Sequence, residues 1–368
     1  MRKNVSVYLD LIRWLSAIGV YLCHAGYFVM PAIPKELANQ GTECVAVFFV
    51  LSGLVIRHVS SEKEKDWRQY LTARLARLSS VVLLALAVTV AADMTGLAAN
   101  PGAYIGKGWF SGAYGMDAWL SSLTFSGEFW FRHVVVGSNE PYWSLGFEVP
   151  YYALFGAAAF ARGRWRAALI VLWALAVGPK VLAYLPLWLL GVLVRDLLRR
   201  RPFALRRPRL VGLGLIAASI AIYAADKYLV WANPAAPMFA PHAAKTLLHS
   251  AAYFSIIGVA VAANIVGFDL MARDAAVWNP RVSWLVRWLA GSSFTLYLVH
   301  QPLLVAAAAL FPGALTSPAA GAAASVAVFV LVLVLAELGE RRKLFFRRII
   351  GAAVLPPVSR PSSVAPEG

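Results

Sequence analysis

Ten stretches of this chain are apolar over roughly the length that a helix needs to cross a lipid bilayer, which is about 20 residues. They cover residues 7–29, 43–60, 78–98, 142–161, 167–179, 181–198, 210–225, 246–268, 288–311 and 319–339. The pattern predicts an all-α integral membrane protein with about ten transmembrane helices.

The composition fits this prediction and excludes several other classes of protein. Hydrophobic residues make up 60% of the chain and charged residues 14%, whereas an average soluble domain is about 45–50% apolar and about 25% charged. These values exclude an ordinary soluble enzyme, a disordered chain and a coiled coil. The net charge of +16 would suit a nucleic-acid-binding protein, but such proteins are not this apolar, so no nucleic acid partner is expected.

The distribution of lysine and arginine predicts the orientation of the helices. With ten spans, 27 of the 34 basic residues fall on the side that both termini share, and six fall on the other side. Cytoplasmic loops carry an excess of lysine and arginine. We therefore expect both termini in the cytoplasm and a multi-pass protein in the cell (inner, cytoplasmic) membrane, surrounded by membrane lipids.

A single membrane domain is expected over residues 1–345. Within it, the polar, glycine-rich and aromatic segment 99–141 is predicted to be an extracytoplasmic loop with an interfacial or re-entrant helix near 118–131. Residues 346–368 are expected to form a cytoplasmic basic segment and a disordered tail.

The first apolar segment carries charged residues and lacks a small-residue cleavage site, so we interpret it as a retained helix rather than a signal peptide. Arg13 and His24 are eleven residues apart, which places them on one face of a helix and about 16 Å apart along it. Asp10 lies three residues before Arg13 and is positioned to pair with it. Cys23 and Cys44 lie in apolar stretches and suggest no metal site. Ionisable residues inside a membrane segment point to function, although a structural Asp–Arg pair and a packed histidine would explain them too.

Three further sites carry polar residues inside predicted spans. Ser52 and Gly53 lie in FFVLSGLVI, which alone is typical of close packing between helices. Glu148 follows in PYWSLGFEVPYY, where a carboxylate in the membrane needs a partner. Tyr297 and His300 share a helix face in GSSFTLYLVHQPLL.

Taken in order, these segments resemble the motifs of the membrane-bound acyltransferase 3 family. The first helix has that family's Asp-x-x-Arg and Arg-x10-His spacing, and YLTARLARL at 70–78 resembles its cytoplasmic arginine motif, with Ala73 and Ser80 in place of the usual arginine and proline. The residues that match the five motifs include Arg13, His24, Ser52, Arg74, Arg77, Trp143, Glu148, Tyr151, Tyr297 and His300.

The resemblance implies acyl transfer, usually of an acetyl group, from acyl-CoA to a hydroxyl of a carbohydrate or glycolipid, with acyl-CoA as donor substrate and no bound cofactor or metal. In this reading His24 is the general base, since its ordinary pKa is near neutral. Glu148 orients the imidazole and stabilises its cation. Arg13 stabilises the thioester oxyanion or holds the pantetheine arm.

Other residues are expected to bind the substrates. Arginines at the cytoplasmic helix ends would hold the phosphates of the donor, although positive-inside topology explains them equally well. Ser52 is an unlikely nucleophile because no base is evident beside it, and His300 either positions substrate or bonds Tyr297 or a backbone carbonyl. The predicted binding residues are Arg57, Arg74, Arg77, Ser52, Trp143, Tyr151, Tyr297 and His300.

Two alternatives stay open at this point. Ten helices with intramembrane charges also suit a transporter or flippase of a glycolipid or polysaccharide precursor, although no inverted-repeat symmetry is visible. An assembly subunit with a decayed active site is the other alternative, and the joint presence of Arg13, His24, Glu148 and His300 argues against it.

Overall fold

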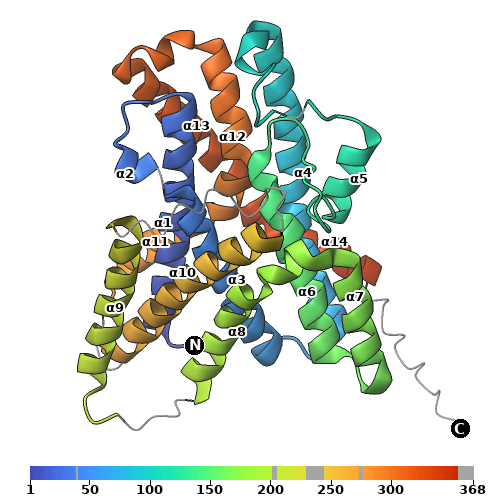
Figure 1. Ribbon diagram of the computed structural model, residues 1–368, viewed down its shortest axis with the longest axis vertical. Coiled ribbons are helices and arrows are strands. Elements are labelled where there is room, and N and C mark those ends of the chain that lie inside the picture. Colours follow the sequence, from blue (N-terminus) through green and yellow to red (C-terminus); the bar gives the residue numbers. More distant parts are fainter. Residues whose placement is uncertain (39, 111, 201–204, 229–243, 273–276, 355–368) are drawn as a thin grey trace, which may run out of the picture.

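The computed structural model describes residues 1–368 except 39, 111, 201–204, 229–243, 273–276 and 355–368, and all regular structure in the described residues is helical (Figure 1). The long helices are α1 Lys3–Phe28, α3 Gly41–Glu62, α4 Trp67–Ala99, α6 Leu145–Phe160, α7 Gly163–Ala183, α8 Leu185–Arg200, α9 Pro208–Tyr228, α10 Ala244–Met271, α12 Ser293–Leu310 and α13 Pro318–Leu338. The shorter helices are α2 Lys35–Ala38, α5 Met116–Thr124, α11 Pro280–Ala290 and α14 Lys343–Val354, with 3-10 turns η1 Pro101–Ala103, η2 Glu140–Ser144, η3 Pro312–Leu315 and η4 Glu340–Arg342.

Eight helices in the described part of the chain are long and apolar enough to span a membrane, and each corresponds to a predicted segment. The other two predicted segments, 142–161 and 181–198, are α6 and α8, with 16 residues each. At 1.5 Å per residue these two are about 24 Å long, shorter than a bilayer core of about 30 Å. The all-α multi-pass fold is thus confirmed, while the count of ten spans and the cytoplasmic termini stay predictions.

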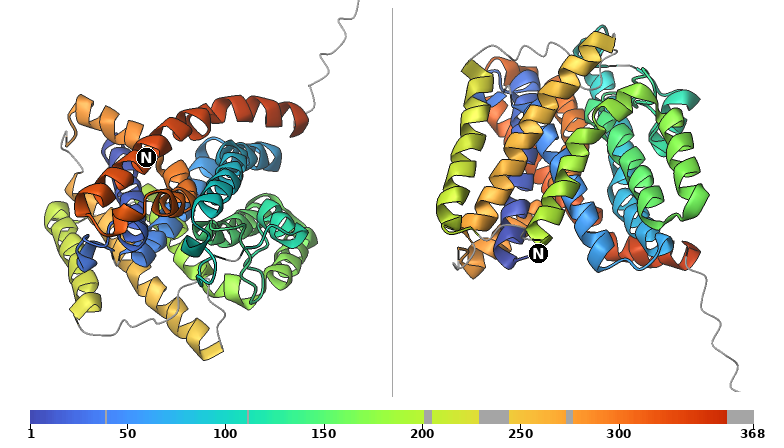
Figure 2. Two further views of the ribbon diagram at one scale, coloured as in Figure 1. Left: turned by 90° about the horizontal axis from the view of Figure 1, so that it is seen from above. Right: turned by 60° about the horizontal axis from the view of Figure 1, so that its bottom comes forward.

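The helices form one bundle around α1, α3 and α12. Helix α12 packs against α1, α4 and α13, and 83% of its span is buried, the largest share among the eight. Helices α9 and α10 pair on one side of this centre, and α6 and α7 pair on the other (Figure 1). The start of α1 and helix α14 lie at the same end of the bundle (Figure 2, right). We call this the basic end because α14 and η4 carry five lysines and arginines.

The segment between α4 and α6 is folded back onto the bundle at the opposite end (Figure 1). Asp93 near the end of α4 accepts hydrogen bonds from the Tyr114 hydroxyl at 2.6 Å and from the Ser138 backbone N–H at 2.8 Å. The helix expected near 118–131 is the shorter α5, which ends where Phe125 adopts a positive φ of 57°. The domain boundary expected after residue 345 falls inside α14, and the tail after Val354 lies outside the described residues.

Two glycines bring the backbones of α3 and α8 into contact. A Cβ at Gly53 would collide with the Trp188 carbonyl oxygen, and a Cβ at Gly191 would collide with the Val50 carbonyl oxygen. The close-packing interpretation of the Ser52–Gly53 pair is therefore confirmed.

We expect Gly191→Ala to lower the free energy of unfolding by roughly 1–3 kcal/mol, because the added methyl group meets backbone atoms that move only if α3 and α8 separate. The thermal unfolding midpoint of the detergent-solubilised protein measures this loss. Gly214→Ala in α9 is the matched control, since nothing lies within 4 Å of the added Cβ. Equal midpoints for the two variants would contradict the prediction.

Candidate functional site

His24 of α1 and His300 of α12 meet in the bundle. Nδ1 of His24 lies 3.0 Å from Nε2 of His300, and the ring centroids are 4.8 Å apart. His300 is fully buried, whereas His24 is half-buried. Both residues were predicted from sequence, but their contact was not.

Backbone carbonyl groups determine which ring nitrogens carry hydrogen. Nδ1 of His300 lies 2.9 Å from the Leu296 carbonyl oxygen, which can only accept, so Nε2 of the neutral ring is an acceptor. Nδ1 of His24 then faces two acceptors, Nε2 of His300 and the Val20 carbonyl oxygen at 3.0 Å, and must be the donor. Nε2 of His24 is therefore left without a hydrogen, which is the state that a general base needs.

Glu148 lies in a second polar cluster, between α6, α3 and α8. Its Oε1 accepts hydrogen bonds from Ser52 Oγ at 2.6 Å and from the Tyr152 hydroxyl. Trp188 Nε1 donates to Ser52 Oγ at 3.2 Å. Among the described residues Glu148 makes no contact with His24, so the expected His–carboxylate pair is replaced by a His–His pair.

Tyr297 lies beside both clusters. Its ring centroid is 6.3 Å from that of His300 and 5.4 Å from that of Phe48 on α3, one turn before the Ser52–Glu148 contact. Its side chain is also within hydrogen-bonding reach of Ser144. The structure thus brings five of the predicted residues, from the four helices α1, α3, α6 and α12, into one region of the membrane domain.

Trp143 and Tyr151 are used in packing. The Tyr151 hydroxyl donates to the Val181 carbonyl oxygen at 2.6 Å, and the Trp143 ring packs edge to face on Phe147 with centroids 5.6 Å apart. Both side chains are buried. Their contact with a substrate stays a prediction.

Two of the three predicted donor-binding arginines already have carboxylate partners. Arg57 makes two bonds to Asp196, at 2.9 and 3.2 Å. Arg74 is paired with Glu64 at 2.7 Å, and its guanidinium lies 4.6 Å from the Tyr70 ring centroid. An anionic ligand would have to displace these carboxylates, which makes both arginines weaker candidates.

Arg77 and Arg13 differ from that pair. The Arg77 guanidinium lies 5.6 Å from the Phe294 ring centroid, and among the described residues it forms no ion pair within 4 Å but interacts electrostatically with Tyr152, Glu148 and Glu340. Arg13 Nη2 donates to Asp10 at 3.0 Å and to the Ala290 carbonyl oxygen at 3.1 Å, so the Asp–Arg pair expected from sequence is present. Arg13 faces the end of α11, on the basic-end side of His24.

Comparison with known proteins decides the family. A family model described as "Acyltransferase domain" matches residues 6–337. The chain belongs to this acyltransferase family. Acyltransferase MdmB of Streptomyces mycarofaciens is 27% identical over 155 residues, which are 39% of this chain and 36% of that protein. Exopolysaccharide production protein ExoZ of Rhizobium meliloti (strain 1021) is 29% identical over 153 residues, 39% of this chain and 43% of that protein.

The matched stretches thus cover less than half of either relative, and no solved structure matches the chain. The family match nevertheless spans all five motifs that first suggested it, from Arg13 to His300. The resemblance drawn from these motifs is confirmed.

Sequence reasoning missed Glu340 in η4. Its Oε2 accepts hydrogen bonds from the backbone N–H groups of Phe294 at 3.1 Å and Thr295 at 2.9 Å, and from the Thr295 hydroxyl at 3.1 Å. The carboxylate therefore caps α12, whose own N-cap residue Ser292 makes no side-chain cap bond. A negative charge is favourable at a helix N-terminus, and this helix carries His300.

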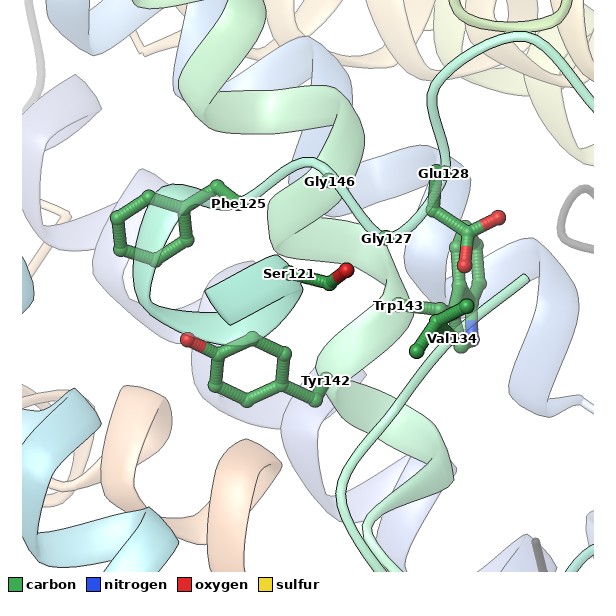
Figure 3. A pocket seen from close by; sticks show the side chains of 8 residues that line it. All are labelled: Ser121, Phe125, Gly127, Glu128, Val134, Tyr142, Trp143 and Gly146. Atoms are coloured by element: carbon green, nitrogen blue, oxygen red, sulfur yellow. The ribbon is translucent and has the colours of Figure 1, made fainter. Parts of the chain in front are cut away.

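A second missed set of charges holds the loop before α6 to the helix bundle. The fully buried Lys180 of α7 lies 2.6 Å from Glu128 Oε2. His133 lies between two carboxylates, with Nδ1 2.7 Å from Glu128 Oε1 and Nε2 2.9 Å from Glu140 Oε1. The cavity beside Glu128 and Ser121 (Figure 3) has a volume of about 10 Å³. It has room for about one water molecule and none for a substrate.

The His133 pair of contacts predicts a pH dependence of stability. Burial by itself lowers the pKa of His133, but hydrogen bonds to Glu128 and Glu140 outweigh it and raise this pKa to about 9. Because the ordinary value is about 6.5, the stabilisation is complete below pH 6.5 and is lost as the pH rises through about 9. The thermal unfolding midpoint should fall between pH 6 and 10 for this reason. In the His133→Gln variant the midpoint should fall less over the same pH range. Parallel profiles would contradict the prediction.

Proposed function

We propose that this protein is an integral-membrane O-acyltransferase that moves an acetyl group from acyl-CoA to a hydroxyl of a carbohydrate or glycolipid acceptor. One observation carries the proposal: the contact with His300 leaves Nε2 of His24 unprotonated on a half-buried side chain. Family membership supports the reaction class.

The reaction needs no covalent enzyme intermediate. The acceptor hydroxyl oxygen attacks the thioester carbonyl carbon while Nε2 of His24 takes the hydroxyl proton. The carbon–sulfur bond then breaks, and the departing thiolate takes the proton back from the imidazolium. His300 accepts a hydrogen bond from Nδ1 of His24 throughout, which fixes the tautomer and stabilises the cation, the role first assigned to Glu148.

The donor is proposed to enter from the basic end, with its phosphates near Arg77. This arginine is chosen because no carboxylate of the described residues forms a direct ion pair with it, unlike Arg57 and Arg74, and the charges of Glu148 and Glu340 act on it only from farther away. Arg13 is better placed to hold the pantetheine arm than to stabilise the oxyanion, because it lies about 16 Å along α1 from His24. This assignment agrees with ten spans and cytoplasmic termini in the inner membrane, since acyl-CoA is a cytoplasmic anion.

The acceptor is proposed to approach from the opposite end. The segment between α4 and α6 is rich in aromatic side chains that can stack on sugar rings. Two of them, Trp130 and Phe131, are exposed. The name of the relative ExoZ, an exopolysaccharide production protein, also agrees with a carbohydrate acceptor.

Membranes containing the protein, incubated with acetyl-labelled acetyl-CoA, test the proposal. We expect the label in a glycolipid or polysaccharide fraction, and mass spectrometry of surface glycans with and without the protein then identifies the acceptor. Transport of a precursor without incorporation of label would favour the transporter alternative. Absence of both would favour an assembly subunit, and either result would overturn the proposal.

A further inference from the structure

A groove opens in the bundle on the face of α1 that points away from the histidine pair. It has a volume of about 470 Å³ and is lined by α1, α3, α9 and α10. This volume lies within the range of about 300–1,000 Å³ that is usual for small-molecule sites. Leu15 lines the groove and precedes His24 by nine residues, which is half a turn out of phase at 100° per residue, so the two side chains leave opposite faces of α1.

The polar groups in this groove already have partners within the protein. Asn264 accepts a hydrogen bond from the Tyr8 hydroxyl and donates one to Ser219 at 3.1 Å. Gln40 accepts a hydrogen bond from the Tyr223 hydroxyl. Because these groups are satisfied, they do not require a polar ligand.

Glu43, at the start of α3, is the charged residue of the lining, and it accepts a hydrogen bond from the Tyr253 hydroxyl at 3.4 Å. The space between these polar groups is bounded by aliphatic side chains such as Ile12, Val47 and Ile257. The chemistry of the lining therefore matches a hydrocarbon.

The mouth of the groove opens between helices that are expected to cross the bilayer. All four lining helices are among those long and apolar enough to span a membrane. At the rim, Leu15 is 50% exposed and Ile220 is 60% exposed. Within a bilayer, the hydrocarbon chains of lipids would surround these exposed side chains. If the groove were empty, the atoms of its lining would lose the dispersion contacts that a filled groove provides.

We propose that this groove binds one hydrocarbon chain of a membrane lipid. The chain fills the space between the central helices α1 and α3 and the outer pair α9 and α10. Since α9 packs mainly against α10 among the described residues, the bound chain also links this outer pair to the centre of the bundle. The site is separate from the proposed site of acyl transfer and does not depend on that proposal.

Photo-crosslinking tests this site in the intact protein. The purified chain is placed in vesicles of phosphatidylethanolamine and phosphatidylglycerol with a trace of phosphatidylethanolamine that carries a diazirine on its acyl chain. After illumination, mass spectrometry should find the label concentrated on groove residues such as Leu15, Val47 and Val261. Label spread evenly over all exposed helix faces would overturn the proposal.

Variants that fill the groove supply the control. Ala260 lines the groove and is 6% exposed, so Ala260→Phe should lower labelling of groove residues at least fivefold. Ala252→Phe, at an exposed position of α10 outside the lining, should leave it unchanged. If Ala260→Phe is not folded, Val47→Phe fills the groove from α3. Equal labelling of the groove residues in the filled and control variants would overturn the proposal.

Discussion

Replacing His24 by asparagine is expected to reduce acyl transfer by roughly 10²–10⁴-fold, the usual contribution of a positioned general base. The asparagine amide nitrogen takes the place of Nδ1 and still donates toward the Val20 carbonyl oxygen and Nε2 of His300. No atom of the new side chain stands where Nε2 of His24 stood, so the base is removed while the local hydrogen bonds are kept. Transfer of labelled acetyl groups by membranes, normalised to the amount of folded protein, measures the loss.

Two variants of His300 form the matched control for this result. Gln at position 300 has a side-chain oxygen that can accept from Nδ1 of His24, whereas Ala has no acceptor. If His300 works by fixing the tautomer of His24, His300→Gln should keep clearly more activity than His300→Ala. A near-normal rate for His24→Asn would exclude His24 as the base, and equal losses for the two His300 variants would exclude the tautomer role.

The largest effect on stability is expected from Lys180→Met. Lys180 and Glu128 are both within 1% of complete burial, and breaking such a buried pair costs roughly 3–5 kcal/mol. The half-buried His133 still contacts Glu128 in the variant, so the loss should lie toward the lower end of this range at neutral pH. The thermal unfolding midpoint of the detergent-solubilised protein should fall accordingly. Proteolysis of the loop between α4 and α6 should become faster, since Glu128 belongs to that loop.

A double variant tests whether the buried charge of Glu128 causes the loss of stability in Lys180→Met. Lys180→Met combined with Glu128→Gln removes both charges and should be more stable than Lys180→Met alone, because a neutral amide is cheaper to bury than a carboxylate. Lys107→Met, at an exposed position of the same loop, should change little. If the double variant were no more stable than Lys180→Met, the buried charge would not be the cause.

Much of the fold is predictable from the sequence because the constraint is local. A span needs about 20 apolar residues in a row, and such runs are visible directly. The helices α6 and α8 fall short of this length for different local reasons: residues 140–144 form η2 before α6 begins, and Tyr184 separates α7 from α8. Where the loop before α6 packs depends on distant partners, such as Asp93 with Ser138, and no spacing in the sequence reveals them.

The sequence predicts which residues belong to the candidate site, but not which of them contact one another. His24, Glu148 and His300 stand out because each is ionisable inside an apolar segment. Which of them meet depends on the packing of α1, α6 and α12, and this places Glu148 against Ser52 and His300 against His24. Glu340 gave no signal because an acidic residue just after a span is ordinary, and only its contact with the start of α12 distinguishes it.

The Glu340 cap also bears on how the protein is made. Translation proceeds from α1 toward α12, so His24 leaves the ribosome well before His300. The backbone N–H groups at the start of α12 find their carboxylate later still, after α13 has been translated and residue 340 has left the ribosome. The histidine pair is then fully supported only after η4 has been made, so translation intermediates that stop before η4 lack this support.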